Sequence, residues 1–190
     1  MLIKFLLSSL LGLLCLMPVW YFLAPWLSVP CFLVSGEVCA ALFDWVVRYE
    51  VTGVMGVLVT NLRMTIGPSQ SGLLAPMVDY RLHGYGMVML WAMLLASRPV
   101  GLVGKLALGT GVMLFLQAVG VSIHWLNDIF NRSGPSVLAQ IHVPAFWVEV
   151  VAFYFHFNLF IFTALAPVIL WLSMNRKFVR ALWIDSIPAA

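Results

Sequence analysis

The feature that most constrains this fold is an uncharged apolar run near the start of the chain, from Phe5 to Leu27. Its length matches a helix that crosses the hydrocarbon core of a bilayer, which takes about 20 apolar residues. The whole chain agrees, because 63% of its residues are hydrophobic and only 9% are charged. We therefore expect a mainly α, polytopic membrane protein, with residues 1–190 forming a single membrane domain.

Apolar segments predict four transmembrane helices, at about residues 3–27, 78–97, 105–125 and 146–174. The first is too long for the hydrophobic region of a cleaved signal peptide, so we expect it to stay in the protein, with a kink at Pro18. Basic residues then gather on one side of the membrane: Lys4, Arg98, Lys105, Arg176, Lys177 and Arg180. This asymmetry predicts that both termini are cytoplasmic and that segments 28–77 and 126–145 lie outside.

The longer outer segment is expected to form a small layer at the membrane surface. Residues 32–48 place Glu37, Asp44 and Arg48 on one helical face, which predicts an amphipathic helix lying in the interface. Residues 50–63 are rich in valine and threonine around two glycines, which predicts a short β-hairpin. Residues 65–76 have the glycine and proline content of a linker.

Two polar pairs are predicted between the last two membrane helices. Gln117 is expected to face His156 at mid-depth, and His124 is expected to face Glu149 nearer the outer surface. Polar side chains that would otherwise meet lipid find partners across helices, so we interpret these residues as interhelical contacts rather than as catalysts.

The outer half of this arrangement also collects candidate binding residues, namely Asp79, Arg81, His83, Tyr85 and Asp128. We expect no metal site, because no HxxxH or HExxH spacing occurs, and no cofactor, because no nucleotide-binding motif occurs. The net charge of +3 is too low for a nucleic-acid binder.

A catalytic alternative would use Cys39 with Arg81 and with His83 or His124, because an arginine lowers the pKa of a nearby thiol. We expect Cys39 to lie on the apolar side of the interfacial helix, where thiols are usually inert. Whether Cys31 and Cys39 form a disulfide in the outer compartment is left open.

Several stretches together resemble one family. These are PVWYFLAPWLSVP at 18–30, VLVTNLR at 57–63, HGYG at 83–86, FLQAVG at 115–120 and ALAPVILWLSMNRKFV at 164–179. They are similar to the exosortase H-associated membrane proteins, small bacterial inner-membrane proteins found with a membrane transpeptidase of protein sorting. The resemblance implies an inner-membrane location, with the outer layer in the periplasm.

The resemblance implies an accessory or scaffold protein whose partners are membrane lipids and a membrane-embedded exosortase or its substrate proteins. Exosortases carry a catalytic cysteine followed by serine and glycine, whereas Cys39 is followed by Ala40 and Ala41. No catalytic residue is therefore carried over. Two alternatives stay open: a cysteine transpeptidase or protease of the exosortase type, and a small transport subunit with Gln117 and His156 in a polar path.

Overall fold

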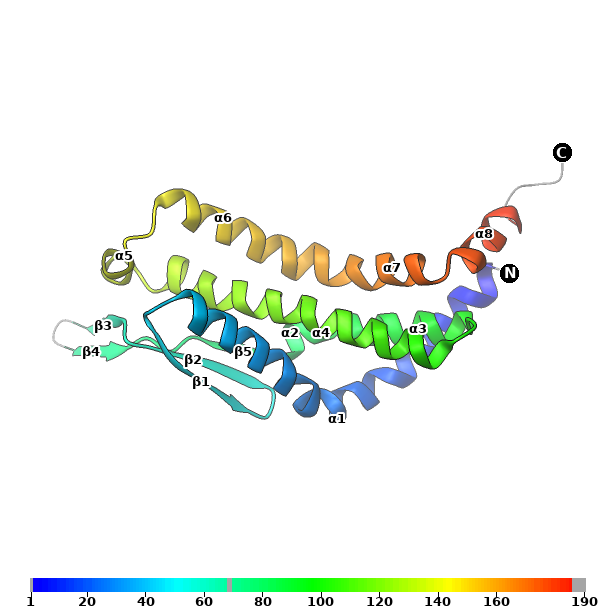
Figure 1. The fold of residues 1–190 in the computed structure, drawn as a ribbon, viewed down its shortest axis with the longest axis horizontal. Coiled ribbons are helices and arrows are strands. Elements are labelled where there is room, and N and C mark those ends of the chain that lie inside the picture. The colour runs from blue at the N-terminus through cyan, green and yellow to red at the C-terminus, as the bar shows by residue number, and fades with distance from the viewer. Residues whose placement is uncertain (1, 68–69, 186–190) are drawn as a thin grey trace.

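The structure is a computed structural model that describes residues 2–67 and 70–185, and it is mainly helical (Figure 1). The helices are α1 (Leu2–Leu42), α2 (Arg81–Gly84), α3 (Gly86–Ser97), α4 (Leu102–Asn127), α5 (Pro135–Ile141), α6 (Ala145–His156), α7 (Thr163–Met174) and α8 (Arg176–Asp185). Two π-helical segments, Asp128–Arg132 and Phe157–Phe162, continue α4 and join α6 to α7. The strands are β1 (Val46–Thr52), β2 (Met55–Thr60), β3 (Arg63–Gly67), β4 (Gln70–Leu73) and β5 (Met77–Asp79).

Helix α1 is one continuous helix of 41 residues, which corrects the prediction of a separate interfacial helix at 32–48. Residues 32–42 belong to α1, and residues 46–48 begin β1. The reason is a buried stripe of small and aromatic residues at helical spacing: Ser28, Cys31, Phe32, Ser35, Gly36 and Cys39. Small residues let α4 approach closely, and the Ser35 hydroxyl donates to the carbonyl of Ala118 at 2.8 Å.

Pro18, the predicted kink, lies inside α1 together with Pro25 and Pro30, and the helix bends along its length in Figure 1. A proline inside a helix removes one backbone hydrogen bond and pushes the preceding turn aside. The Ser28 hydroxyl lies 2.9 Å from the carbonyl oxygen of Pro25 and 2.7 Å from that of Gly53, so its one hydrogen is shared between the two acceptors. The contact with Gly53 joins α1 to the turn between β1 and β2.

A three-stranded antiparallel sheet, in the order β1-β2-β5, lies against the second half of α1 (Figure 1). Strands β1 and β2 form a hairpin in the predicted region, and Gly53 supplies the positive φ of 60° that its turn requires. Residues 65–76, which the sequence indicates as a linker, instead contribute to a second hairpin of β3 and β4.

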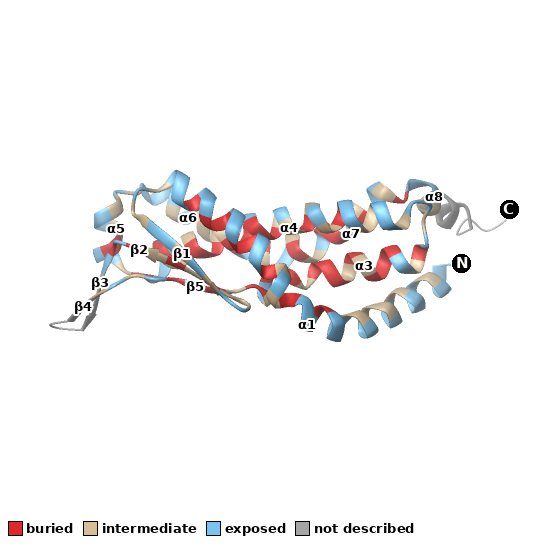
Figure 2. Cartoon of the chain, turned by 60° about the horizontal axis from the view of Figure 1, so that its bottom comes forward, coloured by how far each residue is buried: buried red, intermediate tan, exposed pale blue. Residues whose placement is uncertain are grey.

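Buried residues run along the helical bundle (Figure 2). They form two clusters, an outer core at the end of the molecule that carries the sheet and an inner core toward the end where α8 lies. In the outer core the ring of Phe32 stacks on Trp125 at 5.9 Å, and the indole N–H of Trp125 donates to the carbonyl of Gly56 at 3.3 Å. A Cβ on Gly56 would lie 2.3 Å from the Phe32 ring, so only glycine allows β2 to pass this closely. The inner core consists of Met87, Leu90, Met93, Leu94, Met113, Ala166 and Trp171.

Three helical stretches of the described chain are long and apolar enough to span a membrane: Leu2–Leu42, Leu102–Arg132 and Ala145–Met174. They contain the predicted spans 3–27, 105–125 and 146–174. The predicted span 78–97 is divided among β5, α2 and α3, and α3 has only 12 residues. A helix of that length rises about 18 Å, so a fourth crossing stays a prediction.

Candidate functional site

Two buried histidines meet where α2 packs on α4. The Nε2 atom of His83 lies 3.0 Å from the Nδ1 atom of His124, and the two side chains belong to residues that are 1% and 6% exposed. Helix α2 is a single turn held by the carbonyl of Tyr80, which accepts from the backbone N–H groups of His83 and Gly84. This turn points His83 inward rather than toward the outer surface.

Asp128 extends this contact toward the outer end of α4. Its carboxylate lies 3.9 Å from Nε2 of His124 and 3.0 Å from a guanidinium nitrogen of Arg132. Both neighbours are four residues away along one continuous helix, so they share a face with Asp128. Arg132 is largely exposed, whereas Asp128 and His124 are mostly buried. The row of residues therefore connects the interior with the outer surface.

The two contacts of His124 differ in kind. At 3.0 Å the rings of His83 and His124 share a hydrogen bond, in which either ring is the donor according to its tautomer. At 3.9 Å the contact of His124 with Asp128 is too long for a direct hydrogen bond and is electrostatic. The Nδ1 atom of His83 is buried and makes no hydrogen bond among the described residues.

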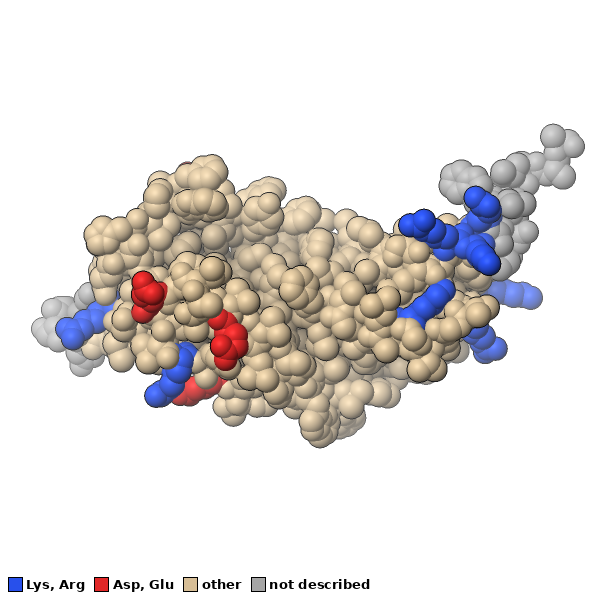
Figure 3. Space-filling view, in the orientation of Figure 1, with Lys and Arg blue, Asp and Glu red and all other residues tan. Residues whose placement is uncertain are grey.

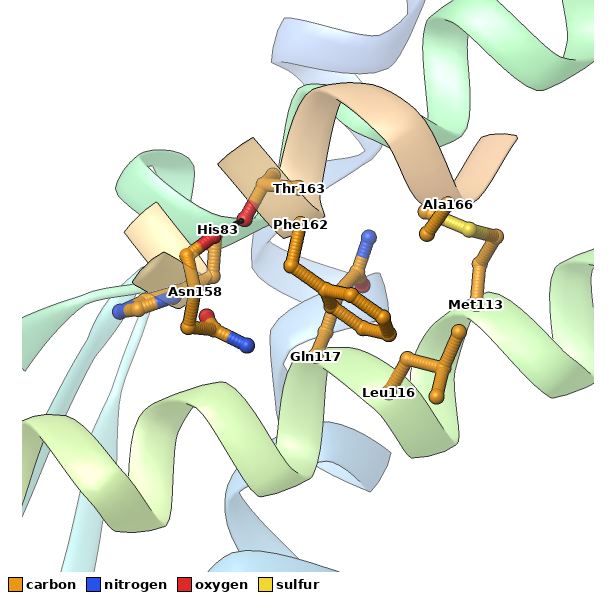
Figure 4. Close-up of a pocket in the computed structure, with 8 residues that line it drawn as sticks. All are labelled: His83, Met113, Leu116, Gln117, Asn158, Phe162, Thr163 and Ala166. Carbon is orange, nitrogen blue, oxygen red and sulfur yellow. Dashed lines mark hydrogen bonds between the residues drawn. The ribbon is translucent and has the colours of Figure 1, made fainter. Parts of the chain in front are cut away.

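A small cavity lies beside this nitrogen (Figure 4). Its volume is about 10 Å³, and its polar lining comes from His83, Gln117, Asn158 and Thr163. Gln117 accepts from the Tyr80 hydroxyl at 2.9 Å and donates to the carbonyl of Gly84 at 3.4 Å. The Thr163 hydroxyl donates to the carbonyl of Asn158 at 2.7 Å. A cavity of this size and polarity has room for about one water molecule.

The predicted interhelical pairs are not the ones that form. Gln117 bonds to Tyr80 and Gly84, while His156 is exposed and its Nδ1 atom lies 2.7 Å from the carbonyl of Ala152 in its own helix. His124 meets His83 and Asp128, and Glu149 is exposed. Both predicted pairings, Gln117 with His156 and His124 with Glu149, are therefore corrected.

The π-helical segment Phe157–Phe162 explains the error. A π turn inserts one extra residue into a helix, so residues on its two sides no longer follow one 3.6-residue period. His156 and Glu149 consequently face outward, whereas Asn158 and Thr163 face α4 and are 8% and 6% exposed. The sequence held one missed signal, because Asn158 is the only side-chain amide in residues 145–174.

The candidate outer-face residues divide into two groups: Asp79 and Arg81 lie at the rim, whereas His83 and Asp128 belong to the buried row described above. At the rim, the Arg81 guanidinium binds the Asp79 carboxylate through two nitrogens at 3.0 and 2.5 Å, and also donates to the Tyr21 hydroxyl at 3.1 Å. The hydrogen bonds from Arg81 lower the pKa of Asp79 below its ordinary value. The half-buried Tyr85 donates to the carbonyl of Leu159 at 3.3 Å.

The cysteines lie away from these groups. Cys39 is 1% exposed, and its sulfur makes no hydrogen bond to a histidine among the described residues. Its neighbour is the hydroxyl of Ser122 on α4. Cys31 and Cys39 are both free thiols of one helix, two turns apart. Eight residues rise about 12 Å along a helix, and a disulfide requires Cα atoms within about 7 Å, so the possible Cys31–Cys39 disulfide is ruled out.

Compared with known families, residues 1–178 match the family described as exosortase H-associated membrane protein. The matched range includes the helical bundle, both hairpins and every residue of the histidine site. No curated protein and no solved structure matches the chain.

Proposed function

Because the chain belongs to the exosortase H-associated membrane protein family, we propose that it is a non-catalytic accessory subunit of an exosortase-type sorting system. In this role it binds a membrane-embedded exosortase, or the substrate proteins of that enzyme, through its membrane helices and its outer layer. The match over residues 1–178 is the observation that carries the proposal, since it extends over nearly the whole chain.

The geometry around Cys39 supports the accessory role over a cysteine transpeptidase or protease. A nucleophilic thiol needs a base within hydrogen-bonding distance and an open approach for the substrate. Cys39 is buried beside Ser122, His83 and His124 bond to each other, and Arg81 is engaged by Asp79. The residues of the catalytic alternative therefore occupy separate contacts. The transport alternative loses its polar path, because His156 faces away from Gln117.

We also propose that the protein lies in the bacterial inner membrane with both termini in the cytoplasm and with four passes. The described Lys and Arg side chains of α1, α8 and the turn before α4 gather at one end of the molecule, and acidic side chains lie toward the other end (Figure 3). This distribution agrees with the positive-inside rule. In this arrangement α3 returns the chain from the sheet to the basic end, as the fourth and shortest pass.

An apolar cleft between α4 and α6 is a suitable contact for the partner. Its volume is about 590 Å³, and its lining includes Phe43, Leu126, Trp147 and Tyr154. Trp147 is 54% exposed and Tyr154 is 53% exposed. Large aromatic side chains with one accessible face are common anchors of protein interfaces.

The test is purification of the tagged protein from its native membrane, with the co-purifying proteins identified by mass spectrometry. We expect an exosortase among them. A photocrosslinking residue at Trp147 should join the partner, whereas the same residue at Val103, 80% exposed near the start of α4, should not. Recovery of the protein alone in several mild detergents would count against the accessory role. Crosslinking only at position 103 would show that the partner binds away from the cleft.

A further inference from the structure

A basic cleft lies at the end of the molecule where α1 begins and α8 follows α7. Its volume is about 550 Å³, within the range of ligand sites. Four of its lining residues are cations from two separate parts of the chain: Arg98, Lys105, Arg176 and Lys177. Figure 3 shows basic side chains gathered at this end. The cleft is distinct from the histidine site, which lies in the outer half.

The cleft has fixed walls. Lys105 donates from Nζ to the carbonyl of Met174 at 2.5 Å and to the side-chain oxygen of Asn175 at 3.3 Å, which joins the start of α4 to the end of α7. Arg98 ends α3 in the left-handed conformation, with φ of 42°. The backbone N–H of Arg98 donates to the carbonyl of Leu94, which closes the end of α3. Hydrogen bonds therefore hold the backbone around the cleft, while the side chains of Arg98, Arg176 and Lys177 are exposed.

Two helices begin at the edge of the cleft. Helix α4 starts at Leu102, and Gly101 before it provides no side-chain cap. Helix α8 starts at Arg176, which itself lines the cleft. The first N–H groups of a helix lack partners within it and carry a partial positive charge, so they favour an anion. The backbone thus adds to the attraction of the four side chains.

The positive charge of the cleft is not neutralised by the described residues. The acidic members of the ion pairs are Glu50, Asp79 and Asp128, all toward the outer end of the molecule. None of the four cleft cations forms an ion pair among the described residues. A basic pocket between membrane helices with no internal carboxylate is suited to an anion supplied from outside the protein.

We propose that this cleft binds the phosphate headgroup of an anionic phospholipid. The neighbouring surface favours a lipid over a soluble phosphate, because Val100 in the turn before α4 and Val103 at the start of α4 are 97% and 80% exposed. Exposed valines beside a cationic cleft match the boundary between acyl chains and headgroups. Phe178 adds an apolar wall within the cleft. The proposal does not rest on the exosortase role, since it concerns the chain and its own bilayer.

The test is native mass spectrometry of the full chain in detergent, titrated with phosphatidylglycerol or with zwitterionic phosphatidylcholine. The double variant Arg98→Gln/Lys177→Gln removes two cleft cations that make no side-chain hydrogen bond among the described residues. The matched control, Lys4→Gln/Arg180→Gln, removes the same charge from exposed positions that do not line the cleft. Thermal unfolding in the same detergent checks that each variant is folded.

We expect the wild type to retain phosphatidylglycerol in preference to phosphatidylcholine. The cleft variant should bind phosphatidylglycerol about 25-fold more weakly, from roughly fivefold for each of the two cations, and the control should stay within about twofold. Equal losses in both double variants would overturn the proposal, because they would show a general effect of charge. Equal binding of the two lipids would overturn it as well. Displacement of the lipid by inorganic phosphate alone would show that the cleft binds a soluble anion, and it would overturn the proposal of a lipid headgroup.

Discussion

The outer and inner halves of the helical bundle are held together by different means. In the outer half, α1, α2 and α4 meet through Phe32, Trp125 and a buried row of hydrogen-bonding side chains that includes His83 and His124. In the inner half, α3 meets α4 and α7 mainly through methionine, leucine and tryptophan side chains, with separate hydrogen bonds between pairs such as Trp171 and Ser97. Hydrogen bonds require particular partners, whereas apolar contacts tolerate exchange. The outer half should therefore be the more sensitive to substitution.

The largest difference is expected between two phenylalanines of α1. Phe32 is fully buried against Trp125 and Tyr80, so Phe32→Ala should cost about 3–5 kcal/mol of unfolding free energy. Phe5 stacks on Trp171 at 4.9 Å but is half-buried, so Phe5→Ala should cost about 1 kcal/mol. Reversible unfolding in mixed detergent measures both. Equal losses would show that the two halves do not differ.

Two glycines of α4 compare the halves more finely. A Cβ on Gly120 would lie 2.6 Å from the side-chain oxygen of Asn158 and 3.0 Å from Nδ1 of His83. A Cβ on Gly109 would lie 2.8 Å from Cδ2 of Leu90, the far end of a flexible side chain. We expect Gly120→Ala to destabilise by about 2 kcal/mol and Gly109→Ala by less than about 1 kcal/mol.

The control for both is Gly111→Ala, where the added Cβ meets no atom within 4 Å. It should leave stability unchanged or raise it slightly, since alanine favours a helix over glycine. The same unfolding assay applies to the three variants. A Gly109→Ala loss as large as that of Gly120→Ala would contradict the greater tolerance of the inner half.

A smaller difference is expected in how pairs of residues are coupled. His83→Leu leaves Nδ1 of His124 without its partner and should cost about 2 kcal/mol. The double variant with His124→Leu should cost less than the sum of the single losses, with a coupling of about 1 kcal/mol. In the inner half, the indole of Trp91 donates to the hydroxyl of Thr110 at 2.8 Å. Its coupling, measured with Trp91→Phe and Thr110→Val, should be nearer about 0.6 kcal/mol.

The smallest effect is a pH dependence confined to the outer rim. Because Arg81 lowers the pKa of Asp79 in the folded protein, the folded state favours the ionised carboxylate. The resulting stability is present above the unfolded pKa of about 3.9 and is lost as the pH falls through the lower folded value. Unfolding measured between about pH 6 and pH 3 should show this loss in the wild type and a weaker loss in Asp79→Asn. Identical profiles would show that the Asp79–Arg81 pair contributes nothing.

The sequence predicts the helices better than it predicts their contacts. Apolar length locates three spans, and β-branched residues around Gly53 locate the hairpin. Periodicity continues to hold inside α4, where Gln117, Gly120 and His124 all lie on the buried side. These features depend on residues close together in the chain.

The contacts that the sequence does not predict depend on changes in backbone register and on distant partners. The π-helical segment at Phe157–Phe162 turns His156 away and brings Asn158 inward, and a 3.6-residue period cannot anticipate it. The partner of His124 comes from α2, a single helical turn that the sequence merges into a longer predicted helix. Helix α1 continues past three prolines, and its Ser28 and Ser35 hydroxyls contact the carbonyls of Gly53 and Ala118, which are distant in the sequence.

The length of α1 sets how far the sheet lies from the end of the molecule where α1 begins. Its 41 residues correspond to about 60 Å of helix, twice the hydrocarbon thickness of about 30 Å. The sheet is hydrogen-bonded to the C-terminal half of α1 through Ser28 and through Tyr49, whose hydroxyl donates to Glu37 at 2.7 Å. If the proposed partner binds the sheet, α1 therefore fixes the distance between that partner and the basic end of the protein.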